Sequence, residues 1–551
     1  MAGTTRAVGV DFGTSTSLVA EKVGRSPVEV VPLGRTARWF PSVAGYQSEA
    51  LVVGEDAEVL PGDRVIRSVK RAITEELETL DVMGPRGVRE VVADDVIVAV
   101  LSEIGRRSAA ADLPLTTEGD IRLGCPAMWT GPQRARLLGL AAKAGLPISN
   151  STLVDEPIAA GIAWVTHRFL MYGERPAGRL LVFDMGGGTL DIAVLDVEGG
   201  EHPEISVLSA LGTAHAGDRL DAVVADELAA DLAGAGVDVD GQAGLFRAHL
   251  LRAARETKVR LSTAHTHAIV LPRLLGRTPV LPYGRERLET AFRAQMDDAE
   301  RLVWAALRAA LLTERGSPSP DALRRMGQTE LAAGVHYVLL AGGMSRVPYV
   351  ERRIGALFPH AQIFDNAGVT ADEAIVAGLA DNGSYERLNL HRPGFDFVLE
   401  WQHAGQHREQ TVYPAFTPFY EPWQVLNGQT NLGYEWWGQD FVGPGDGVAV
   451  FRVRSTSGDH LGLTFDGQAM DGFRVRLGRH LMVKLYCDGR ILIRDGTGRA
   501  FDMRVDRWPV LRGRGAARLK LRSVAAGSPT PPTPWFLEKE WAPPPPRARR
   551  R

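Results

Sequence analysis

Two stretches of the sequence share an arrangement that limits what the chain can fold into: an aspartate and a glycine-rich turn between two apolar, β-branched runs. They are VGVDFGTSTSLVA at residues 8–20 and VFDMGGGTLDIAV at residues 182–194. Each pattern predicts two strands joined by a tight turn. Two ordinary hairpins would explain either stretch alone, but the coincidence of Asp, Gly and Thr in both copies favours a duplicated unit with one purpose.

The glycines in both turns indicate the function that the two hairpins share. Without a Cβ, residues 186–188 let a ligand approach the backbone closely and are free to adopt positive φ. Consecutive N–H groups in such a turn bind anions, and residues 13–15 offer a second set. Asp11 and Asp184 precede the two turns, and carboxylates beside a polyphosphate suit a hydrated Mg²⁺. We therefore expect two hairpins that grip a magnesium-bound phosphate chain from opposite sides; the P-loop pattern is absent.

The sequence as a whole falls into regions that differ in their pattern of apolar and polar residues. At 551 residues it is too long for one core. Residues 1–382 alternate strand-like and helix-like segments, with helices predicted over 131–146 and 288–312, which is typical of an α/β fold. Beyond about residue 385 the pattern becomes that of an antiparallel β-domain with one face exposed to solvent. We expect the Lys484 side chain to lie on this exposed face.

Composition excludes several classes of protein. The net charge of −3 creates no field that would attract nucleic acid or a membrane surface, and no apolar run reaches membrane-spanning length. Cys125 and Cys487 match no metal or redox spacing and are expected to be reduced thiols. We therefore expect a cytoplasmic protein with no nucleic-acid partner and no membrane partner.

Five segments resemble, in order, segments of the Hsp70 (DnaK-like) chaperones of the actin-like ATPase superfamily. They are the two hairpins, LVDEPIAAGIAW (153–164), VLLAGGMSRVPYVERRI (338–354) and VTADEAIVAGLA (369–380). The resemblance implies a two-lobed, duplicated, ribonuclease-H-like α/β domain followed by an all-β, sandwich-like domain. The domain limits that we predict are 1–382 for the nucleotide-binding domain, 383–395 for a linker, 396–525 for the β-rich domain and 526–551 for a disordered Pro/Arg-rich tail.

The resemblance also implies roles for individual residues. The catalytic residues would be Lys70, Glu156, Asp184 and Thr189. The carboxylates near the metal would be Asp11, Asp184 and Asp191. The nucleotide-binding residues would be Asp11, Gly13, Thr14, Ser15, Gly186, Gly187, Gly188, Thr189, Gly217, Lys258, Ser262, Gly342, Gly343 and Arg346. Pro126 and Arg134 resemble a switch that reports nucleotide state to a second domain, and the implied cofactors are ATP/ADP, Mg²⁺ and K⁺.

These roles predict a slow, regulatory ATPase whose nucleotide state controls a β-domain that binds a peptide or protein client, with a nucleotide-exchange factor as a further partner. The sequence departs from the family at Arg255, where a glutamate usually contacts adenosine, and at Thr152, where an arginine usually docks J-domain co-chaperones. We therefore do not infer from the resemblance that this protein prefers adenine nucleotides or couples to J-domain co-chaperones. The rival interpretations are an ATP-gated scaffold, a filament-forming actin-like protein and a sugar kinase, for which no sugar pocket is evident.

Two interpretations of the β-rich region stay open: a diverged peptide-binding-like β-domain, or an unrelated β-sandwich. The tryptophans that could line a groove or fill a core, the core being favoured, are Trp401, Trp423, Trp436 and Trp437. Because the last predicted strand leads directly into the Pro-rich tail, we expect no helical cover over this domain.

Overall fold

The computed structural model describes residues 6–24, 26–84, 87–115, 120–148, 153–199, 204–237, 243–271, 280–313, 325–381, 392–419, 433–455, 460–486, 489–507 and 518–524. The chain divides into two compact units, Met1–Val303 with Ala332–Arg387 and Trp304–Leu331 with Leu388–Arg551. Several predictions lie outside the described residues: the linker up to residue 391, the tail at 526–551, Thr152, Trp423 and Cys487. The domain limits given above stay predictions.

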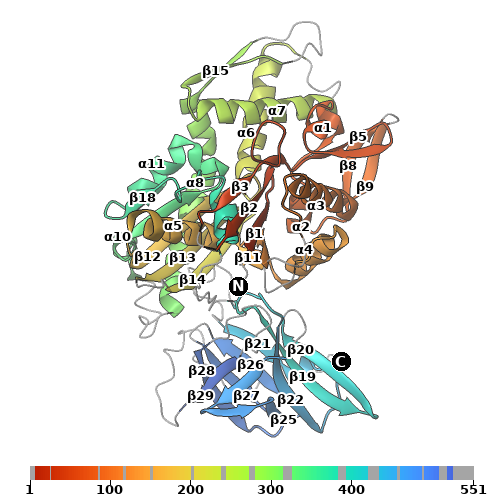
Figure 1. The fold of residues 1–551 in the computed structure, drawn as a ribbon, viewed down its shortest axis with the longest axis vertical. Helices are drawn as coiled ribbons and strands as arrows, with labels where there is room; N and C mark the ends of the chain where they lie inside the picture. The colour runs from red at the N-terminus through yellow and green to blue at the C-terminus, as the bar shows by residue number, and fades with distance from the viewer. Residues whose placement is uncertain are drawn as a thin grey trace, which may run out of the picture. The chain divides into compact units, whose positions relative to one another are not determined.

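The first unit contains two sheets with the same strand arrangement (Figure 1). In spatial order the first consists of β11 (Leu153–Asp155), β10 (Asp120–Cys125), β1 (Arg6–Phe12), β2 (Thr16–Val23) and β3 (Glu29–Val31). The second consists of β18 (Gln362–Phe364), β17 (Tyr337–Ala341), β12 (Gly178–Met185), β13 (Leu190–Glu198) and β14 (Glu204–Thr213). In each sheet, three antiparallel strands are extended by two parallel ones. The duplicated α/β architecture is confirmed.

Shorter strands complete the first unit. They are β4 (Phe40–Pro41), β5 (Ala44–Gln47), β6 (Ala50–Val53), β7 (Val65–Ile66), β8 (Thr79–Gly84), β9 (Gly87–Val92), β15 (Thr266–Ile269) and β16 (Leu281–Gly284). β4 adds to the first sheet beside β2, whereas β5, β6 and β7 form a small sheet of their own, and β8–β9 and β15–β16 are hairpins.

Helices make up much of the rest of the described chain. They are α1 (Glu55–Glu58), α2 (Arg71–Thr74), α3 (Ala93–Ala110), α4 (Gly131–Lys143), α5 (Glu156–Tyr172), α6 (Gly217–Gly234), α7 (Ala243–Leu261), α8 (Arg285–Thr313), α10 (Gln328–Ala333), α11 (Pro348–Leu357) and α12 (Ala374–Ala380), with 3₁₀ turns η1 (Gly62–Arg64) and η3 (Gly343–Arg346). α8 and α10 each have residues in both units. α4 and α8 confirm the two helices predicted from periodicity. α4 begins after Thr130, which forms a capping box with Gln133, and stops before Gly145, whose φ is 79°.

Close backbone approaches bring α12 against both β1 and α5. A Cβ on Gly9 would lie 2.5 Å from the carbonyl oxygen of Val376, and one on Gly378 would lie 1.7 Å from that of Ala159. Only glycine permits such approaches. Because α5 begins at Glu156 and β1 leads to Asp11, this packing fixes the elements that carry two predicted site residues.

The second unit contains two packed sheets (Figure 1, cyan to blue). The first has the order β20 (Gln406–Tyr413), β19 (Phe395–His403), β22 (Val448–Ser455) and β25 (Phe473–Arg476). The second has the order β21 (Gly433–Trp437), β26 (Met482–Tyr486), β27 (Arg490–Arg494), β28 (Ala500–Arg507), β29 (Arg518–Ser523), β23 (Gly462–Phe465) and β24 (Gln468–Met470), with a 3₁₀ turn η4 (Gly438–Asp440) after β21. Residues of both sheets share one apolar core, so the region is a β-sandwich, as expected.

Three expectations about this unit meet different outcomes. Trp401 and Trp436 are buried in the shared core, which confirms the core interpretation for both. The expectation for Lys484 was wrong: its side chain is buried and pairs with Glu435, because β26 is an inner strand covered on both faces. The strand pairing is antiparallel except between β23 and β29, which are parallel.

Among the described residues, no helix combines the length and the apolar character needed to cross a bilayer.

Candidate functional site

The two glycine-rich turns face each other. A Cβ on Gly187 would lie 2.5 Å from the Ser15 hydroxyl oxygen, and one on Gly188 would lie 2.7 Å from that of Thr14. The first turn follows β1, and the second joins β12 to β13. The lack of a Cβ at Gly187 and Gly188 permits this close approach. No φ in either turn lies in the left-handed region, so the glycines' freedom to adopt positive φ is not used here.

Three carboxylates lie at the bases of these turns. Asp11 is near the end of β1, and Asp184 in β12 is the register partner of Asp191 in β13. All three are buried, since the strands that carry them are the inner strands of their sheets. The main-chain N–H of Met128 donates to Asp191 at 3.3 Å. The duplication therefore brings carboxylates from both halves of the unit to one region.

Lys70 and Glu156 form a buried ion pair beside these carboxylates. Lys70 immediately precedes α2, and Glu156 is the first residue of α5. The Lys70 Nζ also lies 5.6 Å from the centroid of the Trp129 ring. The two predicted catalytic residues, 86 positions apart in sequence, are thus in direct contact.

The cluster shifts the pKa of several members. Burial, reinforced by the charge on Glu156, raises the pKa of Asp11 to about 7. Burial and the same charge raise the pKa of Asp191 to about 7, against the lowering effect of a hydrogen bond from Thr189. Burial also raises the pKa of Asp184, with contributions from the neighbouring carboxylates. Although burial by itself would lower the pKa of Lys70, the charges of Glu156 and Asp11 outweigh it and raise that pKa.

A divalent cation fits this arrangement. Excess buried negative charge is costly, and a hard cation with oxygen ligands would relieve it. Asp11 Oδ1 is buried and has no hydrogen-bond partner among the described residues, so it is available as a ligand. The residues that could hold Mg²⁺, directly or through water, are Asp11, Asp184 and Asp191.

We expect the unliganded protein to lose stability as the pH rises, through the proton held by Asp11. A carboxyl group whose pKa is raised on folding stabilises the fold below its unfolded value, near 3.8, and that stability is lost as the pH rises through about 7. Asp11→Asn removes this dependence. The melting temperature of Asp11→Asn minus that of the parent should therefore increase between pH 5 and pH 8, as measured by circular dichroism. A difference that is constant or decreases with pH would contradict the buried, proton-binding carboxyl.

A second set of predicted residues adjoins the turn after β12. The N–H of Gly217, the first residue of α6, donates to the Gly186 carbonyl at 3.2 Å. Lys258 Nζ in turn donates to the Gly217 carbonyl at 3.1 Å. A Cβ on Gly342, whose φ is 78°, would lie 2.5 Å from Asp184 Oδ1. Thus β12, α6, α7 and the loop after β17 meet at one place.

Three predicted residues are not brought to the carboxylates by any described contact. Ser262, the residue directly after α7, donates to the Lys258 carbonyl in the last turn of that helix. Arg346 is half-exposed and pairs with Asp372, and Gly343 begins the η3 turn that ends at Arg346. Their part in binding stays a prediction.

The predicted switch residues are in contact. Arg134 is buried, and its Nη2 lies 3.5 Å from the Pro126 carbonyl oxygen. The same guanidinium donates to Asp155 at 2.5 Å and, through Nε, to the Trp129 carbonyl at 2.9 Å. Asp155 directly precedes Glu156, so a single peptide bond links the contacts of Arg134 to the ion pair between Glu156 and Lys70.

Sequence reasoning missed Trp129, Asp155 and Asp218. Asp155 stands beside Glu156 in the quoted VDEP segment, so adjacency was an available signal. No sequence signal pointed to Asp218. The Ser68 hydroxyl, just before α2, donates a hydrogen bond to the Asp218 carboxylate, and the main-chain N–H of Asp218 donates to the Gly187 carbonyl at 2.7 Å. The Arg255 guanidinium lies 3.3 Å from the same carboxylate. Arg255 thus pairs with acidic side chains.

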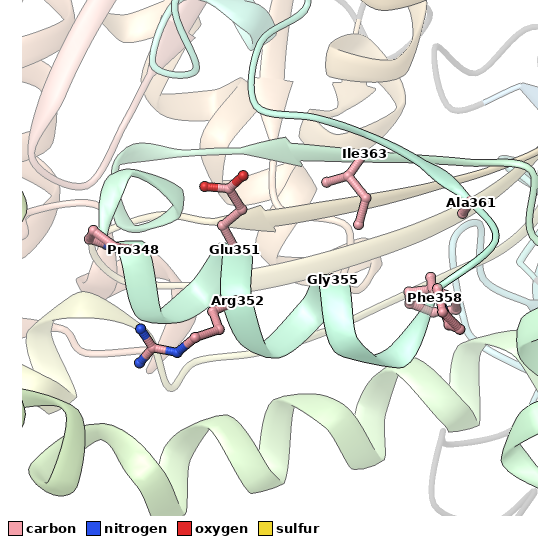
Figure 2. Close-up of a pocket in the computed structure, with 8 residues that line it drawn as sticks. Pro348, Glu351, Arg352, Gly355, Phe358, Ala361 and Ile363 are labelled. Carbon is pink, nitrogen blue, oxygen red and sulfur yellow. The ribbon is translucent and has the colours of Figure 1, made fainter.

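Two features outside this cluster also have residues of the kinds found in binding sites. A surface groove beside α11, drawn in Figure 2, is lined by Pro348, Glu351, Arg352, Gly355, Phe358, Pro359, Ala361 and Ile363. None of these lining residues was predicted to bind nucleotide, and no carboxylate of the cluster is among them. The groove is therefore separate from the candidate site.

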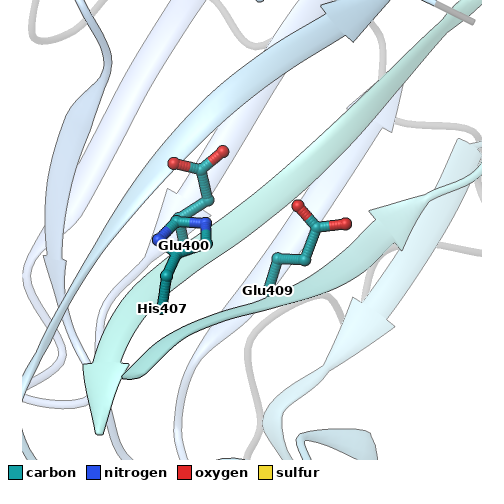
Figure 3. A group of neighbouring side chains, drawn as sticks. All are labelled: Glu400, His407 and Glu409. Atoms are coloured by element: carbon teal, nitrogen blue, oxygen red, sulfur yellow. The ribbon is translucent and has the colours of Figure 1, made fainter. Parts of the chain in front are cut away.

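The second feature is the group Glu400, His407 and Glu409 on the β19–β20 hairpin, whose ligand atoms lie within 4.8 Å of one another (Figure 3). Arg452 lies 3.0 Å from the Glu400 carboxylate, and Arg454 lies 2.8 Å from that of Glu409. Guanidinium groups already compensate both charges, so we assign no metal to this group.

Comparison with known proteins gives one family. The family model described as Hsp70 protein matches residues 7–385. Similar curated proteins are the chaperone protein DnaK of Thermotoga neapolitana and that of Thermotoga petrophila, each 29% identical over 408 residues that cover 71% of this chain and 61% of the relative. The chaperone protein DnaK of Thermosipho africanus is 28% identical over 407 residues, with the same coverage. The chain thus spans less than two thirds of the length of the curated relatives that it matches.

Proposed function

The chain belongs to the Hsp70 family, and on that premise we propose that its two hairpins bind Mg²⁺–ATP and that the chain hydrolyses it slowly, as a regulatory switch. The observation that carries the proposal is the opposition of the two turns, with Ser15 against Gly187 and Thr14 against Gly188, above a buried carboxylate cluster. Backbone N–H groups from both halves would hold the phosphates.

Each residue of the cluster has a proposed task. Bound Mg²⁺ supplies charge neutralisation at the phosphate oxygens. Lys70 offsets the charge that develops on the γ-phosphoryl group, since its ammonium is held charged by Glu156 and Asp11. Glu156 orients Lys70 and the attacking water, and Thr189 and Asp184 line the approach. Phosphoryl transfer depends on such positioning more than on covalent catalysis.

A structural change on exchange or hydrolysis of the nucleotide would be transmitted from the site through Glu156 and the adjoining Asp155 to Arg134 and Pro126. We propose that this change controls a client-binding β-sandwich formed by the second unit, with peptides or proteins as clients and an exchange factor as a further partner. The buried Trp401 and Trp436 are part of the sandwich core, so client contacts would be made elsewhere on the sandwich.

Calorimetry tests the nucleotide part of the proposal. Titration with ATP in the presence of Mg²⁺ should give one site per chain, and chelation of Mg²⁺ with EDTA should weaken binding at least about tenfold. GTP serves as the comparison, because Arg255 replaces a glutamate that the family uses near the base. A labelled unfolded peptide, titrated with ATP or with ADP present, tests control of the second unit. Equal affinity for ATP with and without Mg²⁺ would contradict the assignment of the carboxylates.

A further inference from the structure

Trp129 occupies a position that neither the resemblance nor the proposed chemistry uses. Its side chain is fully buried in the apolar core that contains Val8, Val10 and Phe12 of the first sheet. The ring faces Lys70, whose Nζ lies 5.6 Å from the ring centroid. Lys70 itself is 3% exposed, so its ammonium is surrounded by protein on the side of the ring as well as on the side of Glu156.

The orientation of the Trp129 ring is fixed at both ends. The indole N–H donates to the Thr74 hydroxyl at 3.1 Å, and Thr74 ends α2, the helix that begins just after Lys70. The Gln133 amide, from the first turn of α4, donates to the Thr74 carbonyl at 3.0 Å. On the main chain, the Trp129 carbonyl accepts from Arg134 at 2.9 Å. The ring therefore has little freedom to turn away from Lys70.

A buried ammonium gains from an aromatic face because the ring presents the negative part of its quadrupole and excludes water. An ion pair with Glu156 alone would leave Lys70 free to rotate about that carboxylate, since lysine has a flexible stem and no fixed fork geometry. Two contacts, a carboxylate on one side and a ring face on another, define the position of Nζ.

We propose that Trp129 is a positioning residue for Lys70, which holds the ammonium where hydrolysis needs it. This inference rests on the proposed ATPase function, but it makes one claim that is independent of activity, namely that the ring fixes the Lys70 ammonium. Trp129→Leu removes the ring, Trp129→Phe keeps an aromatic face without the indole N–H, and Thr74→Val removes only the hydrogen bond that orients the ring.

Steady-state kinetics give the first test. We expect Trp129→Leu to lower kcat about tenfold with KM for ATP changed less than about twofold, an effect within the range of a desolvated cation–π contact. Trp129→Phe should lower kcat by no more than about threefold, because it keeps an aromatic face and loses the hydrogen bond to Thr74. Thr74→Val should lower kcat about threefold and have no further effect in a Trp129→Leu background, because both changes act through the ring.

Trp164→Leu is the matched control for loss of packing. Trp164 is also buried, but it packs on Tyr337 and Phe364 in the apolar core of the second sheet. It should lower the melting temperature without lowering kcat. The proposal is overturned if Trp129→Leu leaves kcat unchanged, or if Trp129→Phe lowers kcat as much as Trp129→Leu does.

Nuclear magnetic resonance of the ¹⁵N-labelled lysine ammonium groups gives a test without turnover. The Lys70 signal, assigned by its absence in Lys70→Arg, should be visible in the parent and in Trp129→Phe because the group is buried and paired. It should broaden beyond detection in Trp129→Leu, where water gains access. An unchanged signal in Trp129→Leu overturns the proposal even if kcat falls. A parent that shows the signal but does not hydrolyse ATP contradicts the proposed function and leaves the role of the ring to be decided by this spectrum.

Discussion

Lys70→Ala should reduce ATP hydrolysis by at least about a hundredfold while the dissociation constant for Mg²⁺–ATP stays within about threefold of the parental value. Lys70 is the cation that pairs with Glu156 at the buried cluster. In the proposed mechanism its charge acts on the γ-phosphoryl group mainly as negative charge develops there. Binding should persist because, in the proposed function, backbone N–H groups of the two turns and Mg²⁺ would hold the phosphates. Single-turnover hydrolysis and calorimetry, performed on the same preparation, measure the two quantities separately.

Removal of Lys70 also affects the fold, and a second variant separates that effect from catalysis. Glu156 would remain buried near Asp11 without its counter-charge, which costs about 3–5 kcal/mol for a broken buried pair. Lys70→Ala combined with Glu156→Gln removes both charges, so the melting temperature should recover by several degrees while hydrolysis stays low. Parental hydrolysis by either variant would show that Lys70 is not catalytic.

Local sequence signals were sufficient to predict much of the fold. The hairpins of β1–β2 and β12–β13 follow from apolar, β-branched runs around glycine turns, and α4 and α8 follow from helical periodicity. The duplication was evident because the same turn chemistry occurs twice. Asp11 and Asp184 could be placed near one another because they occupy equivalent positions in the two copies.

Contacts between distant segments could not be predicted in the same way. Trp129 and Thr74 meet through the packing of α2 beside α4, and no pattern within either segment indicates it. Lys484 follows the alternation of a half-exposed strand but lies on an inner strand whose outer face is also covered. Alternation reports which residues share a face, whereas burial of that face depends on what packs against it.

The prediction that the three glycines contact a ligand stays a prediction. Gly186, Gly187 and Gly188 are free to adopt positive φ but do not use this freedom, because their φ values lie outside the left-handed region. Their lack of a Cβ instead permits the approach of the opposite turn. Gly187 and Gly188 are the close ones, whereas a Cβ on Gly186 would meet only the Thr189 carbonyl oxygen, at 3.6 Å. The three glycines are therefore not equivalent, and this difference can be measured.

Gly188→Val should weaken Mg²⁺–ATP binding by at least about a hundredfold, or roughly 3 kcal/mol. Its Cβ would lie 2.7 Å from the Thr14 hydroxyl oxygen and 2.9 Å from the Thr14 methyl, so the branched side chain must push the two turns apart or fill the space between them. The fold should survive, since the turn lies at the ends of β12 and β13 and outside their core, and the melting temperature should fall by only a few degrees.

Gly186→Ala is the matched control for this prediction, because it adds a Cβ to the same turn at a distance of ordinary van der Waals contact. Its affinity for Mg²⁺–ATP should stay within about threefold of the parental value. Gly187→Ala, whose Cβ would lie 2.5 Å from the Ser15 hydroxyl oxygen, should fall between the two. If the three variants lose affinity equally, the close approach of the two turns does not determine binding. An equal loss would mean that any substitution in this turn disturbs it, whether at Gly186, where a Cβ has room, or at Gly187 and Gly188, where it does not. If Gly188→Val binds as the parent does, the phosphates do not lie between these hairpins, and the carboxylates below them must serve another ligand.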